Sequence, residues 1–285
     1  MQSTAAALAL GAAFLWGSAQ VIGKIALRDL NATAFNAIRF SAVTIALAPF
    51  AFAAGLGTLG TEIAILAVLS GILGFFIANQ VYFHCLKKAP AHRIIPVGNT
   101  TPVWAVLTAP LLIGEQVNVV LPFSIALVVA GSFMLVPKKV DHYYWKPAAA
   151  LALGSAFIFG LHEVMRKSAI NVGANYLVFL WISVASAAVA TSLMLFISGA
   201  WRGQRFNRTS VGLSITSGIL AHFIGNVFFM LALGLEQVTN LAPFVSAVIP
   251  LGFLLSILIV REKPTRMAFA GMAVVFLGVG LVALF

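Results

Sequence analysis

Polar side chains lie in the middle of apolar stretches of this chain. Trp16 and Gln20 are four positions apart, as are His222 and Asn226, so each pair lies on one face of a helix. Because lipid offers no hydrogen-bond partner, we expect such side chains to face the interior of a helix bundle or water. The candidate substrate-binding residues chosen in this way are Trp16, Gln20, Asn79, Tyr82, Thr100, Trp104, Phe159, His162, Glu163, His222 and Asn226. Aromatic rings beside amide, imidazole and carboxyl groups suit a small amphipathic solute.

Residue patterns typical of catalysis are absent from the sequence. There is no phosphate-binding Gly-Lys loop, no nucleophile elbow and no HExxH pattern. The five histidines have no metal-ligand spacing, and Cys85 is the only cysteine. We therefore expect no catalytic residue, no metal site and no cofactor.

Several of the candidate residues have two interpretations. Glu163 could carry a proton or meet a cationic group, or it could form a local ion pair with Lys167, four positions later. Asn79 and Asn226 could line a cavity or tie helices together. Lys24 lies near the end of its segment, where extension of the side chain to the membrane surface is the default expectation.

Four prolines mark two of the apolar segments as bent. Pro96 and Pro102 interrupt one segment, and Pro243 and Pro250 interrupt another. Proline removes a backbone hydrogen bond and kinks a helix. These residues are the candidate gating hinges, and the alternative is a static kink.

The elements that carry these residues are membrane-spanning helices. Of the 285 residues, 61% are hydrophobic and only 8% are charged, whereas soluble domains carry roughly a quarter charged residues. Apolar runs of about 20 residues favour helices over a β-barrel. The ten predicted segments are 4–27, 32–54, 61–84, 91–113, 118–136, 147–170, 173–198, 210–234, 238–260 and 264–285.

The second half of the chain repeats the first. Residues 9–27 and 152–170 share nine of 19 positions, and residues 70–79 and 217–226 share seven of ten. Five segments per half is an odd number, so the second half enters the membrane from the opposite side. The sequence therefore predicts two inverted five-helix repeats around a central cavity, with the first repeat at 1–140 and the second at 141–285.

The net charge of +10 comes from short connections between segments. Counting connections alternately places 15 of the 17 Lys and Arg residues on one side, Arg39 among them, and leaves Arg166 and Lys167 on the other. The positive-inside rule makes the basic side cytoplasmic and places both termini outside. This distribution explains the charge without nucleic-acid binding.

Short motifs in both halves resemble the drug/metabolite transporter superfamily in its ten-helix, EamA-type form. The residues that carry the resemblance are Leu15-Trp16-Gly17 with Lys24, the stretch from Tyr82 through Leu86, Ala89-Pro90-Ala91-His92-Arg93, Pro102, Gly114-Glu115, and Leu233, Pro250 and Glu262 in the second copy. The resemblance implies alternating-access transport of small organic metabolites. Among family members, the chain looks most like the YddG-type bacterial amino-acid exporters.

The favoured hypothesis is a multi-pass carrier of the bacterial inner membrane that exports amino acids or similar small amphipathic metabolites. The alternative is a proton-coupled exporter of cationic drugs that uses Glu163 as the switching carboxylate. A third class, a non-transporting receptor or assembly factor, gains nothing from an inverted duplication. The expected partners are a small-molecule substrate and the lipid bilayer, and a monomer is the simplest expectation because ten helices can enclose a cavity within one chain.

Overall fold

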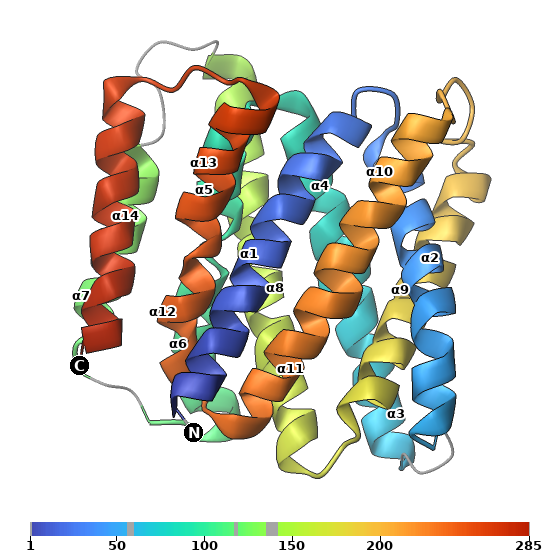
Figure 1. Cartoon of the computed structure of the whole chain (residues 1–285), viewed down its shortest axis with the longest axis horizontal. Coiled ribbons are helices and arrows are strands. Elements are labelled where there is room, and N and C mark those ends of the chain that lie inside the picture. The colour runs from blue at the N-terminus through green and yellow to red at the C-terminus, as the bar shows by residue number, and fades with distance from the viewer. Residues whose placement is uncertain (1, 56–59, 117–118, 135–141, 285) are drawn as a thin grey trace.

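The fold is a bundle of helices that follow the ten predicted segments (Figure 1). The computed structural model describes residues 2–55, 60–116, 119–134 and 142–284. Its helices are α1 (Gln2–Ala26), α2 (Ala32–Ala53), α3 (Thr61–Ser70), η2 (Gly71–Ala78), α4 (Asn79–Lys88), α5 (Ala91–Gly98), α6 (Thr101–Ile113), α7 (Leu121–Met134), α8 (His142–Asn171), α9 (Tyr176–Ile197), α10 (Arg208–Gly218), η3 (Ile219–Gly225), α11 (Asn226–Leu235), α12 (Val238–Ser246), α13 (Val248–Val260) and α14 (Arg266–Leu284).

The predicted fold class, a membrane protein of ten helices in two repeats, is confirmed. Seven helices of the described chain are long and apolar enough to cross a membrane, and 122–131 and 266–278 are shorter apolar helices. Large apolar side chains such as Leu111 and Ile197 point outward, as expected of a surface that meets lipid. The predicted boundary between the repeats, 140/141, lies outside the described residues.

Some predicted segment ends differ from the observed ones. The segment predicted at 61–84 continues to Lys88, and the segment predicted at 147–170 begins at His142. Polar and basic residues at these ends weakened the apolar signal, although the backbone stays helical there.

Two pairs of unbroken helices lie toward the edges of the bundle, and the other unbroken helices, α1 and α8, run among the broken segments. In Figure 1, α7 runs beside α14 at one edge, and α2 runs beside α9 toward the other. The broken segments pack with α1 and α8 between these pairs. Both termini lie at the same end of the bundle in Figure 1.

Two stretches of π-helix lie at equivalent places of the two repeats. η2 and η3 both fall within the duplicated segments 70–79 and 217–226. Each is followed by an asparagine: the Asn79 side chain donates to the Gly74 carbonyl at 3.0 Å, and the Asn226 side chain donates to the His222 carbonyl at 3.4 Å. Such wide turns are frequent at functional sites, and they were not predicted from the sequence.

The fourth and ninth segments break between their prolines. The first break lies at Asn99 and Thr100, between α5 and α6, and the second lies at Ala247, between α12 and α13. Pro102 and Pro250 stand in the first turn after each break, where a missing backbone N–H costs no helical hydrogen bond. The prolines therefore start new half-helices rather than only bending continuous ones.

Each repeat caps a half-helix of the other repeat with a glutamate. The Glu262 carboxylate, after α13, accepts hydrogen bonds from the first two amides of α5, both at 2.7 Å. The Glu115 carboxylate, after α6, accepts from the first two amides of α12, both at 3.0 Å. A carboxylate at a helix N-terminus satisfies free N–H groups and complements the helix dipole. The two caps, which we call the glutamate clasps, link the halves at opposite ends of the bundle.

Two lysines at equivalent positions cap the C-terminal ends of broken segments. Lys24 Nζ donates to the carbonyls of Leu86 and Ala89, at 2.5 and 2.6 Å, where α4 ends. Lys167 Nζ donates to two carbonyls where α11 ends, at 2.7 and 2.9 Å. Lys24 therefore does not simply extend to the membrane surface, because its ammonium group is held by carbonyls that the helix leaves unpaired.

Candidate functional site

A cavity of about 90 Å³ lies between the two halves, beside the helix breaks and the π-helical turns. Its walls are formed by side chains of α1, α2, α4, α6, α8, α11, α12 and α13 together with η2 and η3. Nine of the 11 predicted binding residues line it: Trp16, Gln20, Asn79, Tyr82, Phe159, His162, Glu163, His222 and Asn226. Pro102, a predicted hinge residue, also lines it.

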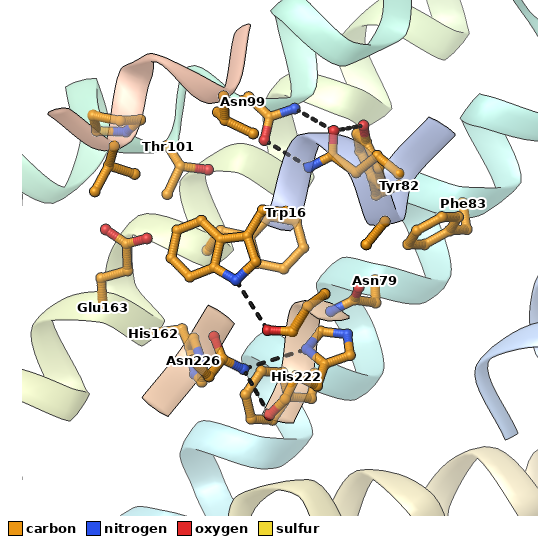
Figure 2. A pocket seen from close by; sticks show the side chains of 18 of the residues that line it. Trp16, Asn79, Tyr82, Phe83, Asn99, Thr101, His162, Glu163, His222 and Asn226 are labelled. Atoms are coloured by element: carbon orange, nitrogen blue, oxygen red, sulfur yellow. Dashed lines mark hydrogen bonds between the residues drawn. The ribbon is translucent and has the colours of Figure 1, made fainter. Parts of the chain in front are cut away.

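Trp16 lines this cavity and lies in the middle of the view in Figure 2. Its indole Nε1 donates to the Ala221 carbonyl in η3 at 3.0 Å, and its ring meets Phe229 edge-on with centroids 5.2 Å apart. A buried indole needs such a partner for its N–H. Trp16 therefore joins the first helix of one repeat to the π-helical turn of the other.

Three side chains close one side of the cavity with a small hydrogen-bond network. Gln20 and Asn99 exchange amide hydrogen bonds at 3.0 and 2.9 Å, and the Tyr82 hydroxyl donates to Gln20 Oε1 at 2.8 Å (Figure 2). Asn99 was not among the residues predicted from the sequence. Its position between Pro96 and Pro102 was the available signal, because a helix break exposes neighbouring polar groups.

The opposite side of the cavity is built around two buried histidines. His162 Nδ1 donates to the Ser70 carbonyl at 3.0 Å and lies 2.8 Å from the Ser70 hydroxyl. The ring of Phe75 contacts both His162 and His222 edge-on, with centroids 4.6 and 5.0 Å apart. His222 also lies 3.4 Å from the Asn226 amide nitrogen.

Two buried arginines complete the site, and both were wrongly predicted to lie in loops. Arg39 is 2% exposed and Arg166 is 3% exposed, and both line the cavity rather than the loops to which the charge count assigned them. The available signal was their position, because each lies within a predicted segment, 32–54 or 147–170, and not in a connection. Arginine stems extend far enough for a guanidinium to be drawn into a polar interior.

Glu163 forms an ion pair with Arg166 and not with Lys167, the partner that its spacing suggested. Its carboxylate lies 4.0 Å from Arg166 Nη2. The predicted local pair with Lys167 does not form, because the Lys167 ammonium turns to the carbonyl groups at the end of α11.

Thr100 and Trp104 were predicted to line the cavity, and the structure places them elsewhere. The Thr100 hydroxyl donates to the Val97 carbonyl at 2.9 Å, and Trp104 packs edge-on against Phe157 at 5.5 Å between centroids. Both residues line a separate small apolar cavity. The break at Asn99 changes the helical phase, so Asn99 and Thr101 face the central cavity instead.

The remaining prolines and the metal prediction can be located on the described chain. Pro96 lies inside α5, Pro250 lies in the first turn of α13, and Pro243 lines a small separate cavity beside Pro102. Groups of three or more His, Cys, Asp or Glu side chains that could hold a metal are not found among the described residues.

Broken apolar helices around a central cavity, with aromatic, amide and charged groups in its lining, are the arrangement of a multi-pass membrane protein. The chain belongs to the EamA-like transporter family, which it matches over residues 3–136 and 146–284.

Two further similarities agree with this membership. An uncharacterized transporter of Archaeoglobus fulgidus is 26% identical over 129 residues, which cover 45% of this chain and 46% of that protein. The match therefore spans about half the length of this curated relative. A crystal structure of another protein superposes with a TM-score of 0.77 over 99% of this chain and 97% of the other, at 17% identity, and shares the fold.

Proposed function

We propose that this protein is a secondary transporter that moves amino acids or similar small amphipathic metabolites across the bacterial inner membrane by alternating access. The observation that carries the proposal is the cavity at the meeting point of both repeats, which is lined by Trp16 and by hydrogen-bonding groups. Aromatic walls bind the apolar part of such a solute, and the amide and imidazole groups bind its polar ends. One chain supplies the whole cavity, which supports a monomer.

The glutamate clasps support an alternating-access cycle. Each clasp joins the two halves at one end of the bundle, through charge-assisted hydrogen bonds to a half-helix. Release of the Glu262 clasp would open one end, and release of the Glu115 clasp would open the other. The breaks at Asn99 and Ala247 supply the points at which the two proline-containing segments bend.

The proposed orientation places the end that carries Lys24, Lys87 and Lys88 in the cytoplasm and both termini outside. The basic residues concentrated at that end support this orientation through the positive-inside rule. Export is the proposed direction of net flux.

Transport assays with reconstituted protein test the proposal. Liposomes that contain the purified chain are loaded with labelled amino acids, and the loss of label is followed against protein-free liposomes. Trp16→Ala, which removes the central cavity wall, is expected to lower the flux at least tenfold, whereas Trp201→Ala, at an exposed ring, leaves it unchanged. Equal flux with and without protein, or full flux from Trp16→Ala, contradicts the proposal.

Proton-coupled export of cationic compounds is the second candidate. The observation that favours it is the buried carboxylate of Glu163 in the cavity wall, since a switching acid must reach the substrate. Coupling predicts that a pH gradient drives flux and that Glu163→Gln abolishes this dependence. Flux that is insensitive to both changes excludes this candidate.

A further inference from the structure

The most unusual feature of the cavity is its excess of positive charge. Arg39 and Arg166 line it, and Glu163 is the one carboxylate among its described lining residues. With neutral histidines, the formal charge of this lining is +1. Burying a charge without a partner costs several kcal/mol, so an unpaired guanidinium in such a place needs an explanation.

Arg39 has no carboxylate partner within the described parts of the chain. The ion pairs found there join Glu262 to His92 and Glu163 to Arg166. The Arg39 guanidinium instead lies against the rings of Phe35, Phe40 and Phe83, at 5.0, 5.3 and 4.6 Å from their centroids. These rings hold the group in place but supply no acceptor atoms for its N–H groups.

The nitrogen atoms of the two arginines are only partly satisfied. Arg39 Nε and Nη1 and Arg166 Nε are buried without a hydrogen-bond partner. Charged donors in this state lose the hydration that they would have in water. A ligand that brings acceptor oxygens would restore these bonds.

The groups between the arginines have too few acceptors to satisfy them. Arg39 Nη2 contacts His222 Nε2, and because a guanidinium can only donate, that nitrogen must accept and the ring proton must sit on Nδ1. His222 Nδ1 then faces the Asn226 amide nitrogen at 3.4 Å, so two donors oppose each other. The Asn226 oxygen already accepts from Arg166 Nη1 at 3.2 Å.

The inverted repeat shows that neither arginine has a basic counterpart at the equivalent position of the other half. α2 and α9 have the same length and equivalent Asn31 and Asn175 caps, and in this register Ser183 occupies the place of Arg39. The Ser183 hydroxyl is satisfied by two backbone carbonyls, at 2.9 and 2.8 Å. Arg166 corresponds to Gly23 in the first repeat. The fold therefore does not require an arginine at either position.

We propose that Arg39 and Arg166 bind the carboxylate of an amphipathic organic acid, whose apolar part lies against Trp16 and Phe159. This inference rests on the proposed transport function and names the substrate class for the same cavity. A carboxylate offers two acceptor oxygens in the plane that a guanidinium prefers. Its single negative charge balances the lining charge of +1, whereas a phosphate monoester carries about −1.5 to −2. A cationic substrate is disfavoured by the same surplus of charge.

Binding measurements with matched probes test this assignment. The purified full-length chain is titrated with 3-phenylpropionate, phenylalanine, phenethylamine and phenyl phosphate, with the heat of binding as the readout. The two carboxylates are expected to bind, and phenethylamine, which has the same ring but no carboxylate, is expected not to bind. The proposal is overturned if phenethylamine or phenyl phosphate binds more tightly than the two carboxylates, or if phenethylamine binds equally well. It is also overturned if neither carboxylate binds at millimolar concentration.

Substitutions separate a role in binding from a role in folding. Arg39→Gln and Arg166→Gln are each expected to weaken 3-phenylpropionate binding by about 10- to 100-fold, because each removes a charge-assisted contact. Arg39→Lys keeps the charge and loses the planar fork, so it is expected to fold and to bind with intermediate affinity. Arg28→Gln makes the same change at an exposed position and is expected to bind like the unmodified protein. Unchanged affinity in the folded Arg39→Lys and Arg166→Gln proteins overturns the proposal.

Flux measurements keep this inference distinct from the proposed function. Arginine-dependent binding of carboxylates without any flux would support the anion site and contradict transport. Flux of amines or amino acids that does not depend on Arg39 would support transport and contradict the anion site.

Discussion

The Glu262 clasp offers the sharpest test of how the two halves move. The carboxylate accepts two backbone N–H groups of α5 at 2.7 Å and lies 2.6 Å from His92 Nδ1. In Glu262→Gln, one oxygen remains as an acceptor, while the new NH₂ group faces a backbone donor. Loss of one charge-assisted hydrogen bond and of the charge at the helix N-terminus costs about 2 kcal/mol or more.

This cost falls on one end of the bundle only, because Glu115 closes the other end independently. If an opened state at the Glu262 end lacks the clasp, the substitution raises the ratio of open to closed molecules by roughly 30-fold. Glu115→Gln is expected to act in the same direction at the opposite end. Its effect should be smaller, because the Glu115 hydrogen bonds are longer, at 3.0 Å, and no histidine adds to them.

Distances between spin labels at each end report the opening. The chain has a single cysteine, the buried Cys85, so a Cys85→Ala background accepts new labelling sites. Exposed Lys88 and Lys263 flank the Glu262 end, and exposed Leu235 and Gln116 occupy the equivalent places at the Glu115 end. Glu262→Gln is expected to add a longer-distance population to the first pair and to leave the second pair unchanged.

The control is Glu62→Gln, which removes an exposed carboxylate from the first turn of α3. It should change neither distance. If folded Glu262→Gln protein shows unchanged distances at both ends, or equal widening at both ends, the idea of two independent clasps is refuted.

Three more predictions follow from the same contacts. Burial raises the pKa of Glu262, but hydrogen bonds from His92 and from the first amides of α5 outweigh this effect and lower the pKa overall. The clasp should therefore stabilise the protein at neutral pH and lose this effect as the pH falls below about 4. In Glu262→Gln, the unfolding temperature should depend less on pH in this acidic range. Lys24→Met should lower stability by about 1–3 kcal/mol in chemical unfolding because two helix-end carbonyls lose their donor, whereas Lys88→Met, at an exposed ammonium, should change it little. Gly71→Ala should lower the unfolding temperature, because the added Cβ meets a backbone carbonyl of α9 and lowers the free energy of unfolding by about 1–3 kcal/mol. Gly154→Ala should leave the unfolding temperature unchanged, because the added Cβ there meets open space. Equal unfolding temperatures of the two alanine variants would contradict this packing.

Much of the architecture could be predicted from local patterns in the chain. Apolar runs long enough to cross a bilayer give the number and order of the segments, because the need to satisfy backbone groups in lipid leaves helices as the solution. Repeated residues such as Asn79 and Asn226 reveal the duplication, and the odd number of segments per half gives the inversion. Polar residues inside apolar runs identified most of the cavity wall for the same reason, since lipid excludes them.

The errors concern features that depend on helical phase and on distant contacts. The break at Asn99 turns Thr100 and Trp104 away from the cavity, and no local pattern records the angle of that turn. Arg39 was predicted to lie in a loop because it is charged, whereas the packing of α2 against its neighbours buries it inside the bundle.

Transmembrane helices, their order and their duplication thus follow from the amino-acid sequence, because hydrophobicity and repetition are properties of short stretches. The glutamate clasps between halves, the π-helical turns and the pair of arginines in one cavity depend on tertiary structure. Each of them arises where residues more than 100 positions apart meet, or where a helix departs from its regular geometry to allow such a meeting. Contacts between residues so far apart in the sequence depend on how whole helices pack, and this packing is established only in the folded chain.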